Sequence, residues 1–339
     1  MQIYKKRRLF RTSWDIISFF RLFFVLLQQT NEYMKSLREL KKLAREELNA
    51  PKVKVALLGD TATQLLVTSI KGEAVDRGLS LDMYEGEYSQ VERQLMDPTS
   101  ELYEYDAEII IIFQSTHKLG EYHSSLSIEK QELVAEERLS FVSTICENPA
   151  FSKKKIIYFN YPEIEDTVFG SYANKVESSF SFQVRKLNYE LMKLSSQCPN
   201  LFICDIAGLQ NVFGRRFMFA PNVYMTTEMV ISVNALPYVA SRVVDIIGAI
   251  RGQFKKCLIL DLDNTVWGGV IGDDGLEGIE LGHGLGIGKA FTEFQMWIKK
   301  LKQRGIIICV ASKNNEEIAK EPFEKHLFIP LPKNKQFSI

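Results

Sequence analysis

The chain has 339 residues, of which 46% are hydrophobic and 25% are charged, and its formal net charge is zero. This length predicts two domains of ordinary globular composition. The balanced charge excludes a general electrostatic attraction to nucleic acid. The five cysteines form no CxxC pair and the four histidines have no metal-ligand spacing. These features argue against a disulfide framework or a zinc site and favour a reducing compartment, so we expect a cytoplasmic protein.

Residues 1–50 form a basic, amphipathic extension, with eleven Lys and Arg against five Asp and Glu. An apolar run at 16–27 contains Arg21 and is too short to cross a hydrocarbon layer of about 30 Å, so we expect no membrane span. No small-residue cleavage site follows it. Three interpretations stay open: a surface-lying amphipathic segment, a packed leading helix, or an extension upstream of a start at Met34.

Residues 51–250 alternate between predicted strands and helices, after an amphipathic helix with leucines from Leu37 to Leu48. Such alternation predicts a parallel sheet with helices on both faces. The continuous β-branched run at 109–113 is typical of a strand that is covered on both sides. The predicted strands are 53–58, 81–84, 109–113, 155–159 and 201–205, and the predicted helices are 61–77, 128–147, 172–196 and 230–250.

Residues 251–339 begin a second unit of the same kind. A buried strand at 257–260, a helix at 290–303, a strand at 306–311 and a helix at 314–325 make one and a half βα repeats. We therefore predict an α/β fold with two doubly wound α/β/α Rossmann-like units, of which the second is incomplete.

Two aspartates follow the strand at 257–260, where open α/β sheets bind their ligands. Asp261 ends the strand and Asp263 lies two residues further on. An aspartate can form an acyl-phosphate intermediate, and a second carboxylate can protonate the leaving group and then deprotonate water. Because two carboxylates repel a phosphate, Mg²⁺ is almost required.

The strand at 306–311 delivers a hydroxyl, Ser312, about fifty residues after the two aspartates. A hydroxyl beside the backbone N–H groups of a helix start suits phosphate oxygens. Ser312 alone also fits a helix N-cap, and the run from Asp261 to Thr265 also fits a turn with Asx capping.

Residues 255–326 resemble the haloacid-dehalogenase (HAD) superfamily, and within it the FkbH-like branch. The resemblance rests on the run from Lys256 to Gly275, above all Trp267-Gly-Gly-Val-Ile-Gly, and continues through 278–282, Phe294-Gln295, Arg304-Gly-Ile and Ser312-Lys-Asn-Asn315. It implies a nucleophile at Asp261 and a general acid/base at Asp263. It also implies Mg²⁺ held by Asp261 and the backbone carbonyl of Asp263. The phosphate contacts that it implies are Asn264, Thr265 and Ser312.

Members of the FkbH-like branch are associated with biosynthetic clusters. Some resemble glyceryl transferases, which take a phosphorylated three-carbon acyl compound, remove phosphate, and load the acyl unit onto an acyl carrier protein. The resemblance therefore implies a phosphorylated small molecule and a carrier protein as partners. Cys257 is a conceivable thioester-forming residue, but it lies roughly 13 Å along the strand from Asp261, so we predict core packing for it.

The sequence departs from the family pattern after Ser312, where 27 residues remain. The pattern asks for a later lysine and a later acidic pair, yet no Asp follows Asp274, and Lys313 belongs to the Ser312 motif. The tail at 329–339 looks unrelated. We therefore expect a C-terminally truncated member with weak or no phosphatase activity and an uncovered apolar sheet face.

Residues 53–205 resemble the SGNH-hydrolase-like domain that precedes the phosphatase unit in this branch. The resemblance rests on the strand that ends at Gly59-Asp60-Thr61, on Tyr103 and on the strand at 109–113. Active members carry serine at the place of Thr61, and the late DxxH motif is absent here. We expect a degraded domain whose loop at 59–61 binds an anion or the carrier protein. Asn160 and residues 170–174 fit an oxyanion site or simple turns.

Two classes of function therefore compete. One is a Mg²⁺-dependent phosphatase or acyltransferase that acts with a carrier protein. The other is a non-catalytic remnant that binds partner proteins, and an SGNH-type esterase is the remaining alternative.

Overall fold

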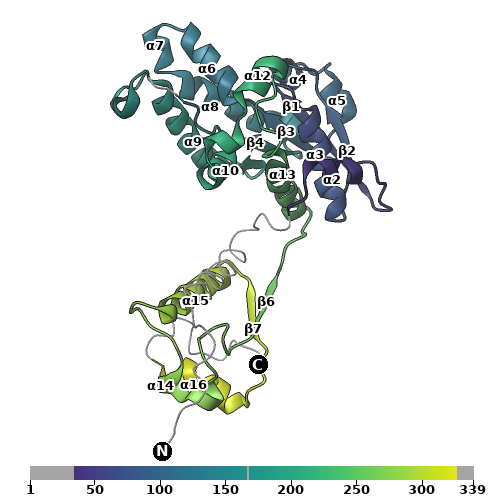
Figure 1. The fold of residues 1–339 in the computed structure, drawn as a ribbon. Coiled ribbons are helices and arrows are strands. Elements are labelled where there is room, and N and C mark those ends of the chain that lie inside the picture. The colour runs from purple at the N-terminus through teal and green to yellow at the C-terminus, as the bar shows by residue number, and fades with distance from the viewer. Residues whose placement is uncertain (1–33, 166–167, 327–339) are drawn as a thin grey trace, which may run out of the picture. The chain divides into compact units, whose positions relative to one another are not determined.

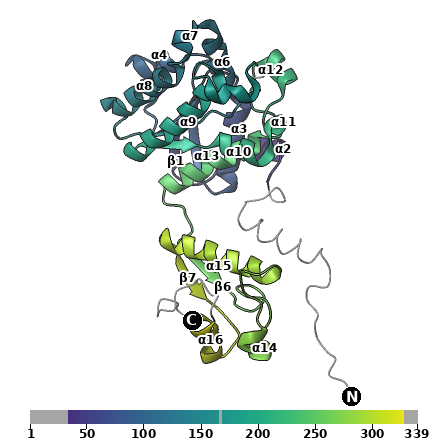
Figure 2. The same ribbon diagram turned by 90° about the vertical axis from the view of Figure 1, so that its left-hand side faces the viewer.

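The computed structural model describes residues 34–165 and 168–326, which fall into two compact units at 34–252 and 253–326 (Figures 1 and 2). The predictions for the basic cluster and the apolar run of the first 33 residues, and for the tail at 329–339, lie outside these residues. Within the described residues, no helix is both long enough and apolar enough to cross a membrane.

The first unit is built on a five-stranded parallel sheet, as predicted. Its strand order is β2-β1-β3-β4-β5, and every neighbouring pair is parallel. All five residues of the β-branched run are buried, because helices cover both faces of the sheet. The strands are β1 (Lys52–Gly59), β2 (Ser80–Glu85), β3 (Ile109–Phe113), β4 (Lys155–Phe159) and β5 (Leu201–Cys204).

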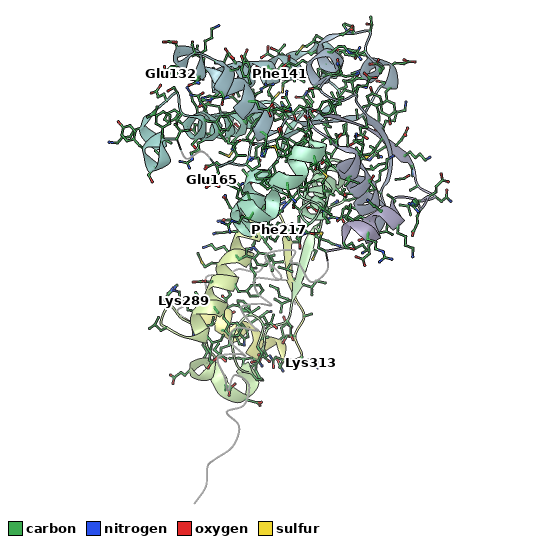
Figure 3. All side chains as sticks on the ribbon, turned by 45° about the horizontal axis from the view of Figure 1, so that its top comes forward. Glu132, Phe141, Glu165, Phe217, Lys289 and Lys313 are labelled. Atoms are coloured by element: carbon green, nitrogen blue, oxygen red, sulfur yellow. The ribbon has the colours of Figure 1, made fainter. Side chains whose placement is uncertain are left out.

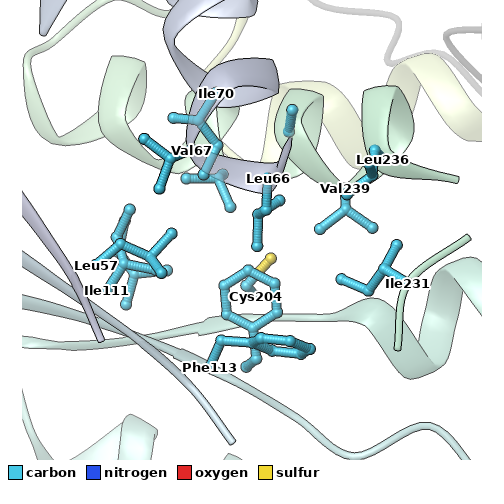
Figure 4. Packing of buried hydrophobic residues seen from close by; sticks show 14 of the residues in the cluster. Leu57, Leu66, Val67, Ile70, Ile111, Phe113, Cys204, Ile231, Leu236 and Val239 are labelled. Atoms are coloured by element: carbon cyan, nitrogen blue, oxygen red, sulfur yellow. The ribbon is translucent and has the colours of Figure 1, made fainter. Parts of the chain in front are cut away.

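Two hydrophobic cores lie on the two faces of this sheet. Alternate residues of each strand point to opposite faces, so Leu57 and Ile111 enter one core while Leu58 and Ile112 enter the other. In the first core they meet α3 (Gln64–Asp76) and α13 (Leu236–Ile250), as Figure 4 shows. In the second core, Leu58 and Ile112 meet α8 (Val134–Glu147) and α9 (Phe180–Gln197). The remaining helices are α2 (Leu37–Leu43), α4 (Val91–Met96), α5 (Glu101–Tyr105), α6 (Thr116–Ser125), α7 (Ile128–Gln131), η1 (Pro149–Phe151), η2 (Gly170–Lys175), α10 (Ile206–Phe213), α11 (Arg215–Met218) and α12 (Pro221–Thr227).

Several predicted helices of this unit were too long. The stretch 172–196 is broken, because Ser179 caps a new helix by accepting a hydrogen bond from the backbone N–H of Phe182. The stretch 128–147 divides into α7 and α8, and the helix predicted to start at 61 starts at Gln64. The helix predicted from 230 starts at Leu236, since Ile231 pairs with Phe219 in an isolated bridge.

The second unit pairs β6 (Cys257–Leu260) with β7 (Ile307–Val310) in parallel. Its helices are α14 (Ile271–Gly278), α15 (Ile287–Gln303) and α16 (Glu316–Lys325). Leu260 and Val310 are buried on one face of the pair with Ile298 of α15.

The opposite face of β6 and β7 is open within the described residues. The exposed fractions of Ile259 and Ile307 are 67% and 60%. Cys257 is also exposed, and its Sγ lies 3.6 Å from Sγ of Cys309. The prediction that Cys257 packs in a core, within a fully buried strand, was therefore wrong, because no described element covers this face.

Helix α2 packs so closely on α3 that a side chain at Gly72 has no room. A Cβ atom built there would lie 2.2 Å from the backbone oxygen of Leu40, which is itself fully buried. Because backbone atoms cannot rotate away, any larger residue must push the two helices apart.

We predict that Gly72→Ala lowers the free energy of unfolding by about 1–3 kcal/mol, measured by urea denaturation. Helix propensity alone predicts the opposite change, because alanine in a helix interior stabilises the helix by about 1 kcal/mol relative to glycine. Gly120→Ala in α6 is the matched control, because its Cβ would meet only the side chains of Phe180 and Ile164. Equal destabilisation by both substitutions would contradict the predicted clash.

Candidate functional site

The candidate site lies where β6 and β7 end. Leu260 is paired with Val310, and the backbone N–H of Ala311 donates to the oxygen of Leu260 at 2.8 Å. The loops that follow the two strands therefore leave the same edge of the sheet side by side, although about fifty residues separate them in the chain.

The carboxylate of Asp263 is fixed by donors from three parts of the chain. Its Oδ1 accepts hydrogen bonds from the indole Nε1 of Trp267 and from the backbone N–H of Ile271, both at 3.1 Å. Its Oδ2 accepts a hydrogen bond from Nδ2 of Asn314 at 2.7 Å. Because both oxygens are engaged, the orientation of this carboxylate is set before any ligand arrives.

Asp261 is exposed, in contrast to Asp263. Its Oδ1 accepts a hydrogen bond from the backbone N–H of Leu262 at 2.8 Å, and no other donor reaches its carboxylate from within 34–165 and 168–326. One carboxylate is thus held by the protein while its neighbour is open to an incoming group.

The other predicted phosphate contacts lie in the same two loops. Asn264 adopts a left-handed conformation with φ of 55°, and its Oδ1 accepts a hydrogen bond from Gly269 N at 3.0 Å, which closes the loop. Thr265 is half-buried. Ser312 Oγ accepts a hydrogen bond from Asn314 N at 3.2 Å. Ser312 is not the N-cap of α16; that place belongs to Asn315, which accepts from Glu317 N.

Buried side chains support the loop after β6. Trp267 is fully buried and its ring meets Phe323 of α16 edge-on, with 5.5 Å between the ring centroids. The buried amide of Gln295 donates to the backbone oxygen of Val266 at 2.9 Å. Sequence reasoning missed these roles. Trp267, Gln295 and Asn314 stand inside the motifs, but their spacing alone does not reveal their partners.

The donor set of this site suits Mg²⁺. No group of three or more His, Cys, Asp or Glu residues that could hold a metal occurs among the residues the structure describes. Asp261 nevertheless offers an exposed carboxylate, and Asp263 offers a backbone carbonyl in the same loop. Mg²⁺ is typically bound by one or two carboxylates and keeps several water ligands, so these oxygens fit it. Figure 3 labels two basic side chains of the same unit: Lys313 lies in the loop that follows β7, and Lys289 lies on α15.

The carboxyl edge of the first unit's sheet holds the second candidate, Asp60. Both of its carboxylate oxygens lie 2.9 Å from the backbone nitrogen of Ser115. Burial raises the pKa of Asp60 to about 7, and it outweighs the hydrogen bonds from Ser115 and the charge of Arg138, which act to lower that pKa.

Thr61 follows Asp60 but is not joined to a base. Its hydroxyl is buried and has no hydrogen-bond partner within the described part of the chain. His123 Nε2 lies 2.8 Å from the backbone oxygen of Ser178, and His117 packs against Phe219 and Tyr224. Neither ring has a hydrogen bond with Thr61.

The polar groups around Thr61 are used within the fold. The backbone N–H of Asp60 donates to Phe113 O, so one amide of the expected anion nest at 59–61 is committed, and the adjacent N–H of Ala62 donates to Glu228 O. Asn160 donates to Asp205 and accepts from Ala207 N. In the segment 170–174, Asn174 Oδ1 accepts from Arg185. These bonds join different segments of the chain and hold the polar groups within the fold.

Comparison with known proteins places the chain in a family. Residues 54–248, more than half of the chain, match the family model of the FkbH N-terminal domain, so the chain belongs to the FkbH family. A solved structure with 56% sequence identity and a TM-score of 0.84 covers 90% of this chain, and 81% of that chain is covered. It is the N-terminal part of the protein BF1531 from Bacteroides fragilis, which contains a phosphatase domain and was crystallised in complex with Mg.

Two further solved structures each cover a little more than half of this chain. The acetyl xylan esterase AlAXEase has 11% identity, a TM-score of 0.38, and coverage of 57% of this chain and 100% of its own. The lipase Lip_vut3 from a goat rumen metagenome has 17% identity and a TM-score of 0.37, and the match covers 56% of this chain and 95% of the lipase chain. No curated protein matches the chain.

We predict that the stability of the first unit falls as the pH rises from about 4 to about 7. The pKa of Asp60 is about 7 in the folded protein and near 3.8 ordinarily, so in this window the folded state keeps a proton that the unfolded chain has lost. Asp60→Asn should flatten this part of the pH profile of the free energy of unfolding, measured by urea denaturation. The control is Asp82→Asn at an exposed position, which should keep the slope. An unchanged slope in Asp60→Asn would show that another group carries the pH dependence.

Proposed function

We propose that the chain carries a HAD-type phosphatase or phosphotransferase site with Asp261 as nucleophile and Asp263 as general acid/base. The observation that carries this proposal is the pairing of an exposed carboxylate with one that three donors hold in place, both at the carboxyl edge of two parallel strands. Membership of the FkbH family and the similarity to a protein with a phosphatase domain support it.

The reaction proceeds in two steps on this chain's own side chains. In the first, an oxygen of Asp261 attacks phosphorus while the bond to the leaving oxygen breaks, which yields an aspartyl phosphate. Asp263 gives its proton to the leaving alkoxide. In the second, Asp263 takes a proton from water, the water oxygen attacks phosphorus, and phosphate leaves Asp261 as a free carboxylate. Transfer to another acceptor replaces water by that acceptor.

The contacts around Asp263 suit both of these roles. In the described part of the chain, Oδ2 accepts a single hydrogen bond, from Asn314, so its second lone pair is left for the exchange of a proton with the leaving group and with water. The bonds from Trp267 and Ile271 to Oδ1 are independent of that exchange, so they keep the carboxyl in place through both steps. Thr265 and Ser312 are the hydroxyls that we assign to the phosphate oxygens.

Mg²⁺ would be held by Asp261 and the backbone carbonyl of Asp263, where it supplies positive charge for the phosphate oxygens. The Mg in the related Bacteroides fragilis structure supports this cofactor. With the metal in place, the repulsion between the phosphate and the two carboxylates is offset.

The substrate that we propose is a phosphorylated small molecule, with an acyl phosphate as the candidate that the family resemblance favours. In that case the released acyl unit would pass to an acyl carrier protein. We assign the catalytic site to residues 251–339 and an SGNH-hydrolase-like binding domain to residues 51–250. The esterase alternative is disfavoured, because Thr61 has no histidine partner in the described residues.

A non-catalytic role in partner binding is the second candidate function. It is favoured by one observation: no further acidic residues gather with Asp261 among the described residues to complete a metal site. The two candidates differ in whether phosphate is released in an Asp261-dependent way.

We predict Mg²⁺-dependent hydrolysis of p-nitrophenyl phosphate and acetyl phosphate that is lost in Asp261→Asn by at least about a hundredfold, because the amide cannot form the intermediate. Asp263→Asn should reduce the turnover of acetyl phosphate less than that of p-nitrophenyl phosphate, because the carboxylate leaving group of acetyl phosphate needs no proton. Phosphate release is the measurement.

The control for these variants is Asp273→Asn, which changes an exposed aspartate of α14 and should keep activity. Turnover that persists in Asp261→Asn would overturn the assignment of the nucleophile. A folded, purified chain without any turnover on either compound would favour the non-catalytic candidate.

A further inference from the structure

A basic groove runs along α2 on the first unit. We use this name for two adjoining hollows of about 500 and 380 Å³ that share Leu37, Arg38 and Val233. The first hollow is lined by Leu37, Arg38, Lys41, Lys42, Arg45 and Val233, and the second adds Phe217, Pro237 and Tyr238 among others. The basic groove shares no residue with the site at Asp261.

The cations of the basic groove form a stripe along one side of α2. Arg38, Lys41 and Lys42 follow the spacing of i, i+3 and i+4, which places them on one face of α2, and Arg45 comes two residues after the helix ends at Leu43. All four are exposed, and none has an ion-pair partner within 34–165 and 168–326. The nearby Lys35 is different, because Asp76 neutralises it at 2.8 Å.

The acidic residues of α2 do not compensate this stripe. Glu39 is turned back to the start of the helix, where it accepts hydrogen bonds from the backbone and hydroxyl of Ser36 in a capping box. No acidic side chain lines either hollow. The groove therefore presents uncompensated positive charge.

The other wall of the basic groove is apolar. Val233 is 42% exposed, although it lies between the buried Ser232 and Ala235 near the start of α13. Phe217 packs against the ring of Tyr238, with 5.6 Å between the centroids, and Figure 3 labels it in the first unit. An apolar wall that faces a charged stripe matches the two faces of an amphipathic segment.

We propose that the basic groove binds an acidic amphipathic helix of a partner protein. The three helical cations span about one turn, roughly 6 Å, and Arg45 continues the row past the end of α2, so the row is longer than one phosphate group and matches acidic residues spaced along a helix. The apolar residues of such a helix would cover Val233 and Phe217. The chain's own first 33 residues have the wrong charge for this role in composition, with six Lys and Arg against two Asp and Glu.

The close packing of α2 on α3 makes the stripe a prearranged surface. Leu40 is fully buried against α3, and the capping box fixes the start of α2. The backbone positions of Arg38, Lys41 and Lys42 are therefore set without a ligand, which lowers the ordering cost of binding. Because all four are exposed, attraction to the partner should weaken strongly with salt.

The test uses the full chain and a fluorescein-labelled peptide of about five helical turns, with Leu on one face and Glu on the other. Fluorescence anisotropy at about 50 mM salt should show binding that weakens at least tenfold in the double variant Arg38→Glu, Lys42→Glu. Val233→Ser should weaken binding several-fold. The same peptide with Lys in place of Glu should not bind.

The matched control is Lys130→Glu with Lys153→Glu, which changes net charge equally at exposed positions outside the groove and should keep full affinity. Circular dichroism confirms that each variant is folded. Equal weakening by both double variants, or no binding of the acidic peptide, would overturn the proposal. So would displacement of the peptide by inorganic phosphate alone, or a dimer in sedimentation that Arg38→Glu, Lys42→Glu dissociates.

Discussion

The parallel pairing of β6 with β7 is the constraint on which the candidate active site depends. It sets Leu260 opposite Val310, and from that level each strand continues into a loop that carries polar side chains. The hydrogen bond from Asn314 to Asp263 spans the two loops and exists only because the strands end together. Trp267 connects this geometry to the core, since its ring is buried against Phe323 while its indole N–H holds Asp263. Packing of the second unit and orientation of the Asp263 carboxylate are thus one physical arrangement.

The strands were predictable from sequence because their signal is local. A run such as Ile109–Phe113 has enough β-branched side chains to specify a strand that is buried on both faces. Helix boundaries were harder, because the break before α9 depends on which backbone N–H groups the hydroxyl of Ser179 reaches. The exposure of Cys257 could not be predicted from its apolar neighbours, since burial depends on the strands and helices that lie alongside. The positions of the site loops followed from the motif, whereas the part played by Asn314 became visible only with its partner in space.

The two sheet edges use their polar residues in different ways. At the edge of the first unit, polar side chains are satisfied within the fold: Asp60 by the backbone N–H of Ser115, and Asn160 by the carboxylate of Asp205 and the backbone N–H of Ala207. A buried polar group that already has its hydrogen-bond partners in the fold has few lone pairs or N–H groups left to bind a ligand. At the edge of the second unit, the carboxylate of Asp263 is likewise satisfied by hydrogen bonds within the fold, whereas the carboxylate of Asp261 is exposed. An attacking carboxylate has to be open to its substrate in this way.

The face of β6 and β7 that no described element covers has a consequence for how the chain behaves in solution. Ile259 and Ile307 present apolar side chains to water next to two strands that, within the described residues, each have an unpaired edge. Unpaired backbone N–H and C=O groups beside exposed isoleucines favour strand addition from a neighbouring molecule. Concentrated samples of this chain should therefore tend to self-associate through the second unit, and the thiols of Cys257 and Cys309 on the same surface would make that tendency sensitive to oxidation.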